Sequence, residues 1–167
     1  MTNEMIYFAK AKTNTAKKVL FGLLGTSVLL IVATYLTKKY SGIIWVLALG
    51  FITATIYVYN KYVASEYRYE IVNFESKPVF TVSMRVGKTE RTMARLDLCD
   101  VTEIRKMSRD EYRLHKCDKG VLRYSYFPTM FAKEVYFICV RSEYENADVF
   151  IEIDEAFAAK LEFYRTV

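Results

Sequence analysis

Proline and glycine are scarce in this sequence of 167 residues, which contains two prolines and six glycines. Their scarcity excludes collagen and flexible low-complexity polymers, and an aromatic content of 16% excludes an intrinsically disordered chain. The three cysteines, Cys99, Cys117 and Cys139, are odd in number and have no CxxC spacing. This pattern excludes a disulfide framework and indicates a reducing, cytosolic compartment for the part of the chain that holds them.

The sequence contains no phosphate-binding loop, no G-x-S-x-G and no H-E-x-x-H motif. His115 and Cys117 are candidates for chemistry, since H-x-C on a strand places both side chains on one face. Zinc would need two more ligands, and Cys99, Cys139 and Asp118 are suggestive only by residue type. A cysteine nucleophile would need a third group to orient the histidine, and the sequence identifies none. We therefore expect a packed cysteine beside a surface histidine, with no catalytic residue, metal site or cofactor.

The formal net charge of +5 is unevenly distributed. Residues 1–62 carry seven lysines against one glutamate, a net +6, whereas residues 63–167 carry 17 basic and 18 acidic side chains, a net −1. A nucleic-acid-binding protein would show its basic surface within the folded domain. Here the lysines flank apolar segments, which is the distribution found beside transmembrane helices and near anionic lipid headgroups. We therefore expect no nucleic-acid partner.

Two uncharged runs, 19–37 and 40–60, contain 19 and 21 residues. As helices they would be about 28–32 Å long, close to the hydrocarbon thickness of a bilayer. We predict a transmembrane hairpin over 19–62 that turns at about 37–42. A cleaved signal peptide is the rival interpretation of the first run. It is disfavoured because the run exceeds the usual apolar core, Lys38 and Lys39 follow it, and no A-x-A site ends it.

The lysines and arginines near the span ends predict orientation. Seven lie on the two outer flanks and two in the connecting turn, which places both termini in the cytoplasm and the chain in the plasma (inner) membrane. Residues 1–18 form a basic juxtamembrane segment that lies on the inner headgroups or is a loose tail. Small residues four apart, Gly22 with Thr26 and Gly50 with Ala54, predict close helix packing within the hairpin, with homodimerisation as the alternative.

From residue 63 the pattern changes to alternation of apolar and polar residues, which predicts half-buried strands. We expect about seven strands, at 67–71, 80–86, 91–96, 112–116, 121–127, 135–141 and 149–153; the stretch 98–107 is either a strand or a helical turn. Turns at 87–88 and 117–120 predict antiparallel hairpins.

The last segment, 154–165, has the pattern of a capped amphipathic helix. Asp154 is its N-cap, and Phe157, Leu161 and Tyr164 form one apolar stripe. A helix this short must dock on other structure to persist in water. The expected fold class is therefore α+β, with a two-helix transmembrane hairpin followed by an antiparallel sheet or partly open barrel over 63–167, capped by the C-terminal helix.

This order of elements resembles bacterial membrane proteins that carry a PH-like domain. The segment 94–104 (ARLDLCDVTEI) looks like the strand end of those domains, and 153–161 (IDEAFAAKL) is similar to their C-terminal helix. The resemblance implies anchoring and interaction more than a reaction. The basic motif of lipid-binding eukaryotic relatives is incomplete, because Lys77 and Arg85 are followed by Gly87, so inositol-phosphate recognition is not expected.

Charge also divides the polar part of the chain. Residues 63–133 have a net charge of +4 and residues 134–167 of −5. Basic residues expected to contact anionic lipid are Lys10, Lys12, Lys17, Lys18, Lys61, Arg105, Lys106 and Arg109, with Arg113 and Lys116 in the same group. The acidic region 143–155 would meet a protein partner. Solvated loops and edges protected by charge are the alternative interpretation.

The function expected from these features is that of a non-enzymatic integral membrane protein. It would present a PH-like interaction domain at the inner membrane face, and bind a protein partner or an anionic lipid surface there. The alternative is an accessory subunit of a larger membrane complex, for transport or for the envelope, that associates through the hairpin.

Overall fold

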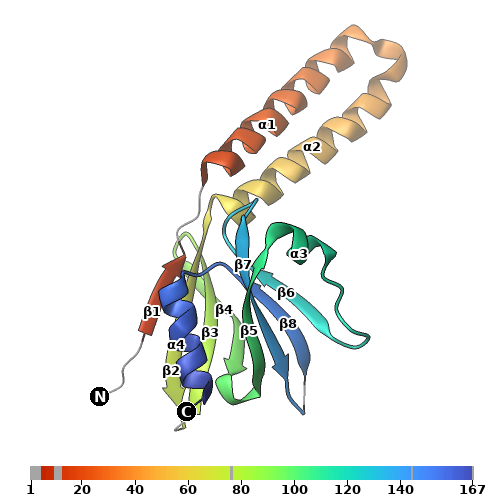
Figure 1. The fold of residues 1–167 in the computed structure, drawn as a ribbon. Helices are drawn as coiled ribbons and strands as arrows, with labels where there is room; N and C mark the ends of the chain where they lie inside the picture. Colours follow the sequence, from red (N-terminus) through yellow and green to blue (C-terminus); the bar gives the residue numbers. More distant parts are fainter. Residues whose placement is uncertain (1–4, 10–12, 76, 144, 167) are drawn as a thin grey trace.

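The computed structural model describes residues 5–9, 13–75, 77–143 and 145–166. Two long helices project from a domain built of two sheets (Figure 1). Helix α1 (Thr13–Leu36) and helix α2 (Ser41–Tyr62) form an antiparallel hairpin around a short 3-10 turn, η1 (Lys38–Tyr40). Both helices are long and apolar enough to cross a membrane, judged by length and composition. The expected hairpin is present, and α1 begins at Thr13 instead of residue 19.

The two helices meet along a seam of small and β-branched residues. Ala16, Ser27 and Thr34 of α1 and Ala48 and Val58 of α2 are buried there. The half-buried positions follow the same faces at intervals of three and four residues, as in coiled-coil packing. Large apolar side chains cover the outside of the hairpin and are exposed, among them Phe21, Leu29, Val32, Leu36, Ile43, Val46, Leu49 and Ile56.

The prediction that Gly22 and Gly50 pack within the hairpin is wrong. Both glycines are exposed, and a Cβ added to either would have no neighbour within 4 Å. Their partners Thr26 and Ala54 are half-buried. The small residues are four apart, as the pattern indicated, but the contact between the two helices runs along the neighbouring face of each helix.

Strand β1 (Met5–Ala9) lies in the segment expected to be a headgroup-bound or loose N-terminal flank. It pairs antiparallel with β2 (Ser65–Phe74), with Tyr7 opposite Tyr69 and Phe8 opposite Arg68. Tyr7 stacks on Tyr69 with ring centroids 6.1 Å apart, whereas Phe8 on the other face is 63% exposed. Because β1 precedes α1 and β2 follows α2, their pairing holds both ends of the hairpin on one side.

The first sheet has the order β1-β2-β3-β4 and is antiparallel throughout. Strands β3 (Lys77–Val86) and β4 (Thr89–Asp97) are joined by the expected turn at 87–88, where Gly87 has φ +61° and so occupies the left-handed region. Val86 is paired with Ser65. This turn therefore lies at the end of the sheet nearest the hairpin.

The second sheet has the order β5-β7-β8-β6. After a 3-10 turn, η2 (Leu98–Asp100), its strands are β5 (Val101–Ser108), β6 (Leu122–Tyr126), β7 (Glu134–Arg141) and β8 (Asn146–Ile151). Within the described part of 63–167 the strands number seven, as predicted. The ambiguous stretch 98–107 contains both alternatives, a helical turn and then a strand. The two sheets are open and do not close into a barrel.

The predicted strand at 112–116 is wrong, because Arg109–Leu114 forms helix α3. Ser108 and Glu111 make a capping box, in which the Ser108 hydroxyl accepts from the Glu111 N–H and the Glu111 carboxylate accepts from the Ser108 N–H. The predicted antiparallel hairpin at 117–120 is wrong for the same reason. Strand β6 pairs with β8 instead, in parallel.

Helix α4 (Glu155–Thr166) has the predicted cap and docks on the sheets. The Asp154 carboxylate accepts from the Phe157 N–H at 2.7 Å. Phe157 and Leu161 are buried in a core shared with Phe80 of the first sheet and Ile138 of the second. A smaller cluster on the opposite face of the second sheet, with Phe137 and Phe150, lies beneath Tyr112 of α3.

Candidate functional site

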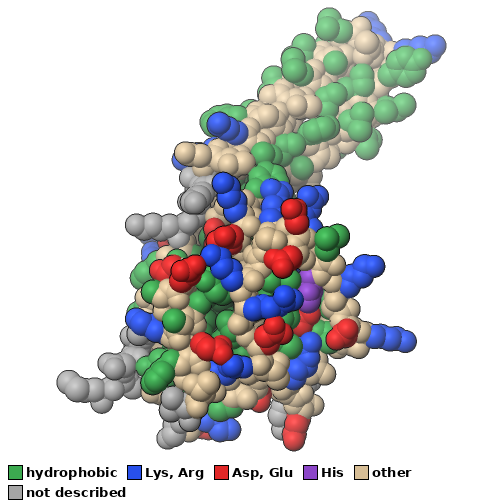
Figure 2. Space-filling view, in the orientation of Figure 1, with side chains coloured by type: hydrophobic (Ala, Val, Ile, Leu, Met, Phe, Trp, Pro, Cys, Tyr) green, Lys and Arg blue, Asp and Glu red, His purple; other side chains and the backbone are tan. Residues whose placement is uncertain are grey.

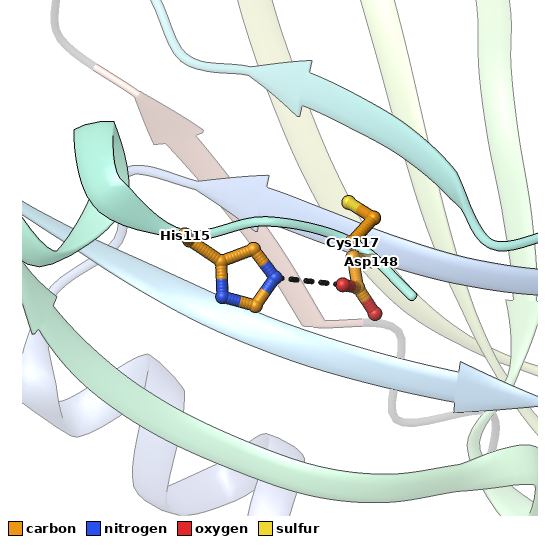
Figure 3. A group of neighbouring side chains, drawn as sticks. All are labelled: His115, Cys117 and Asp148. Atoms are coloured by element: carbon orange, nitrogen blue, oxygen red, sulfur yellow. Dashed lines mark hydrogen bonds and ion pairs between the residues drawn. The ribbon is translucent and has the colours of Figure 1, made fainter. Parts of the chain in front are cut away.

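The chemistry-bearing side chains gather around Asp148, on the face of β8 that points away from the main core (Figure 3). The Asp148 side chain is only 3% exposed. One carboxylate oxygen, Oδ2, lies 2.7 Å from Nε2 of His115, and Oδ1 accepts from both terminal nitrogens of Arg141 at 3.1 Å. The Cys117 thiol lies beside this pair, with its sulfur within 4.8 Å of both the imidazole nitrogen and the carboxylate oxygen. We call His115, Cys117 and Asp148 the Asp148 cluster.

Arg123 holds the backbone that carries His115. Its guanidinium donates to the carbonyl oxygens of Tyr112 and His115 at 2.8 and 3.1 Å. It also lies over the rings of Tyr112 and Phe150, 4.5 and 5.0 Å from their centroids. The His115 ring lies against Phe150 on one side, at 5.3 Å between centroids, and against Phe137 at 5.1 Å. The segment after α3 is thus fixed to the outer face of the second sheet.

The Asp148 carboxylate is stabilised in its ionised form. Burial opposes ionisation, but the interactions with His115, Cys117 and Arg141 outweigh it and hold the pKa of Asp148 below its usual range. Burial and the neighbouring Asp148 carboxylate both raise the pKa of the Cys117 thiol. In a nucleophilic triad the histidine lies between the acid and the thiol. Here the carboxylate lies between the other two, and the thiol is kept protonated.

The Asp148 cluster offers one nitrogen, one sulfur and one oxygen ligand atom, all within 4.8 Å of one another. The H-x-C spacing predicted that His115 and Cys117 lie on one face. They do so in the structure because the backbone at His115 is extended, although this segment is not part of a strand. Sequence reasoning missed Asp148 and Arg141. They lie 33 and 26 positions from His115, and only the parallel pairing of β6 with β8 and the fold of α3 bring them together.

A second group of side chains surrounds the base of the hairpin (Figure 2). Arg109 and Arg113 line a cavity of about 200 Å³ together with Tyr62, at the end of α2, and Phe131. The Arg109 guanidinium lies 4.7 Å from the centroid of Phe131. The Arg109 N–H donates to the Lys133 carbonyl, and Lys133 lines a groove that also contacts Thr15 at the start of α1. Cations therefore adjoin both helices.

We call these cations the basal basic surface; its members are Lys17, Lys18, Lys61, Lys88, Arg109, Arg113 and Lys133. Lys88 belongs to it because the β3–β4 turn lies at the hairpin end of the first sheet. Within the described residues, none of the seven has an ion-pair partner within 4 Å. These cations are therefore free of direct ion pairs, although Glu134 and Glu155 line the same groove as Lys133.

The residues predicted to contact lipid lie in different parts of the structure. Lys10 and Lys12 lie outside the described residues. Arg105 pairs with Glu103 and lies over Phe137 on the outer face of the second sheet. Lys106 is held between Glu134 and Glu155 at 2.9 and 3.0 Å, and these hydrogen bonds raise the pKa of its amine. Lys17, Lys18, Lys61 and Arg109 belong to the basal basic surface.

Most carboxylates of the acidic region 143–155 make hydrogen bonds or ion pairs within the domain. Glu145 accepts from the Tyr124 hydroxyl, Glu152 accepts from the N–H and hydroxyl of Thr129, and Asp154 caps α4. Glu155 pairs with Lys106. Of these carboxylates Asp148 alone is buried, whereas Glu143, Glu145, Asp154 and Glu155 are exposed to solvent.

Comparison of the chain with protein-family models, with curated proteins and with solved structures found no match.

Proposed function

We propose that this chain is a non-enzymatic membrane protein that crosses the bilayer twice and holds its two-sheet domain against anionic lipid headgroups at the cytoplasmic face. The observation that carries the proposal is the hairpin's surface. Its two helices project from the domain, and their large apolar side chains are exposed along both (Figure 2). Water disfavours a surface of this extent and composition, whereas bilayer hydrocarbon accommodates it.

The polar groups within the hairpin support the same environment. Six hydroxyl side chains each donate to a helix carbonyl oxygen three or four residues earlier: Thr26, Ser27, Thr34, Thr37, Thr53 and Thr55. Hydrocarbon offers no hydrogen-bond partner, so a polar side chain there needs one in the protein. Aromatic side chains occupy both ends, with Tyr40 and Trp45 near the turn and Tyr57 and Tyr59 near the domain.

The basal basic surface supports the orientation and the lipid contact. It places seven cations beside the domain end of the hairpin, against Lys38 and Lys39 at the turn. Positive charge favours the cytoplasmic side, and each cation near an anionic leaflet contributes about 1 kcal/mol. The exposed Phe131 ring lies among these cations and gives the surface an apolar contact with the headgroup region.

Hydrogen exchange of the full chain in nanodiscs tests the lipid contact. We expect slower exchange at 109–113 and 130–133 in nanodiscs containing anionic lipid than in purely zwitterionic ones, and we expect 0.5 M salt to remove the difference because it screens exposed charges. Arg109→Glu should reduce the difference, and Arg109→Glu with Arg113→Glu should abolish it.

Lys77→Glu is the matched control, because Lys77 pairs with Phe74 at the end of β2 farthest from the hairpin. Ten strand residues separate the two ends of β2 by about 30 Å. The same exchange in both kinds of nanodisc, or an equal effect of Lys77→Glu and Arg109→Glu, would refute the lipid contact.

The PH-like character of the domain is part of this proposal. Three features support it: an antiparallel meander of β2, β3 and β4, seven strands within the described residues after 62, and a C-terminal helix whose apolar side packs against the sheets. The parallel pair of β6 and β8 and the inserted helix α3 depart from a simple antiparallel arrangement.

An accessory-subunit role is the second candidate, favoured by the outward position of Gly22 and Gly50. These glycines leave room for another helix to approach closely. Gly50→Leu should then abolish co-purification with a membrane partner in mild detergent, while the hairpin stays folded. Ala48→Leu, two residues away and fully buried in the seam, should instead destabilise the hairpin. Retention of the partner by Gly50→Leu would exclude this role for the glycine face.

A further inference from the structure

We propose that the Asp148 cluster binds one thiophilic divalent cation of the zinc class, through Nε2 of His115, Sγ of Cys117 and Oδ2 of Asp148. This site is independent of the membrane proposal. It rests on the convergence of three different ligand atoms within 4.8 Å, in a region where the carboxylate is nearly inaccessible to water. Nitrogen, sulfur and carboxylate oxygen are the ligands that zinc uses in proteins.

The distances fit a ligand set that closes around an ion with small movements. Zinc bonds of about 2.0–2.3 Å place tetrahedral ligand atoms about 3.3–3.8 Å apart. The imidazole nitrogen and the carboxylate oxygen are 2.7 Å apart, so they must separate slightly, and the sulfur must approach from within 4.8 Å. An ion would replace the proton of the Cys117 thiol, which is released to solvent, and the hydrogen on Nε2 of His115, which moves to Nδ1 because a coordinated neutral imidazole keeps one N–H.

The residues around the cluster are arranged as supports for such a site. Arg141 binds Oδ1 and leaves Oδ2 to the ion, so its guanidinium orients the ligand. Arg123 fixes the His115 carbonyl, and Phe137 and Phe150 fix the imidazole ring. The 16% exposure of the His115 side chain provides a route from solvent.

The site has three protein ligands and leaves the fourth position to water. Cys139 is the cross-strand partner of Asp148 on β7, but its thiol lies outside the group of three ligand atoms. Binding would add the Cys117 thiolate to the existing His115–Asp148 link between the segment after α3 and β8. The ion therefore acts by securing α3, whose Arg109 and Arg113 belong to the basal basic surface.

Cobalt titration of the full-length, reduced protein in detergent micelles tests the proposal. We expect one Co²⁺ per chain with a thiolate-to-cobalt charge-transfer band, displaced by Zn²⁺. Excess Zn²⁺ should raise the Tm of the domain by about 5–10 °C, because the ion binds the folded state. Cys117→Ser should abolish the charge-transfer band, and His115→Gln should weaken Co²⁺ binding at least tenfold.

Cys99→Ser is the matched control, because Cys99 is an exposed cysteine in η2. It should bind Co²⁺ like the wild type. Circular dichroism establishes that each variant is folded before titration. Absence of a charge-transfer band in the wild type would overturn the proposal. So would a band that persists in folded Cys117→Ser, or one that disappears in Cys99→Ser.

Discussion

At the scale of single residues, two carboxylates on and after β8 hold separate parts of the chain in place. Asp148 is buried and is hydrogen-bonded to His115 and Arg141, and the bond to His115 secures the segment after α3. Asp154 is exposed and accepts one backbone N–H, which begins α4. Asp148 needs its negative charge to hold His115 and Arg141, whereas Asp154 needs only a side-chain oxygen that accepts the hydrogen bond.

Asp154→Ala should destabilise the domain by about 1 kcal/mol, because the Phe157 N–H loses its cap. Asp154→Asn should retain most of the stability, since an asparagine oxygen accepts the same hydrogen bond. Urea unfolding of the full chain in micelles, followed by the near-ultraviolet circular dichroism of the tyrosines, measures both. Equal losses in the two variants would show that charge, and not capping, is what Asp154 supplies.

Tyr126 gives the domain a pH dependence at alkaline pH. Burial is the main cause that raises the pKa of its phenol to about 12, and the hydroxyl donates to the Met93 carbonyl at 3.4 Å. An unfolded tyrosine ionises near pH 10. The folded state therefore retains this proton where the unfolded state has lost it, so the stabilisation is complete below pH 10 and falls as the pH rises towards 12.

Tyr126→Phe should accordingly make the free energy of unfolding less dependent on pH between about 10 and 12. Urea midpoints of the wild type and the variant at pH 8, 10 and 11 provide the measurement. Their difference isolates Tyr126 from the other groups that titrate in this range, including Tyr69. A difference that stays constant from pH 8 to 11 would show that the buried phenol does not titrate as described.

At the scale of secondary-structure elements, β1 connects the N-terminal segment to the domain. Tyr7 faces inward, where its ring lies 5.2 Å from Phe157 of α4, and Phe8 faces outward. Tyr7→Ala should destabilise the domain by about 2 kcal/mol through lost burial and aromatic contacts. Phe8→Ala should change stability by less than about 0.5 kcal/mol. Urea unfolding compares the two variants, and equal effects would contradict the assignment of β1.

Sequence patterns predicted those elements whose signals are local. The helices of the hairpin follow from uncharged length, the β3–β4 turn from Gly87, and α4 from Asp154 with its apolar stripe. In α3 the local signals compete: the alternation of Tyr112 and Leu114 with charged neighbours indicates a strand, but the capping box of Ser108 and Glu111 begins a helix. The structure shows that the capping box prevails over the alternation.

The sequence could not predict which strands pair when they are far apart in the chain. Strand β1 lies among lysines and next to an apolar run, and only its partner β2, about 60 positions later, stabilises it as a strand. The parallel pairing of β6 with β8 has no local signal either. The Asp148 cluster depends on that pairing, so only its His115 and Cys117 members were identifiable from spacing.

At the scale of the whole molecule, the pairing of β1 with β2 restricts how the chain can cross a membrane. The hairpin leaves the domain after β1 and returns to it before β2, so a membrane-inserted hairpin must have both ends on one side (Figure 1). The basal basic surface adjoins those ends, and η1 with its two lysines lies at the far end. A lipid bilayer around the hairpin would therefore contact the domain through this surface.

Labelling of cysteines in intact cells with a membrane-impermeant maleimide tests the two-span arrangement most directly. The wild type carries an exposed cysteine in its domain, Cys99, and we expect it to react only after the cells are permeabilised. Lys39→Cys adds a thiol in the turn, and we expect it to react without permeabilisation. Labelling of the wild type in intact cells would contradict the cytoplasmic placement of the domain. Equal protection of Lys39→Cys and the wild type until permeabilisation would contradict a hairpin that crosses the membrane and returns.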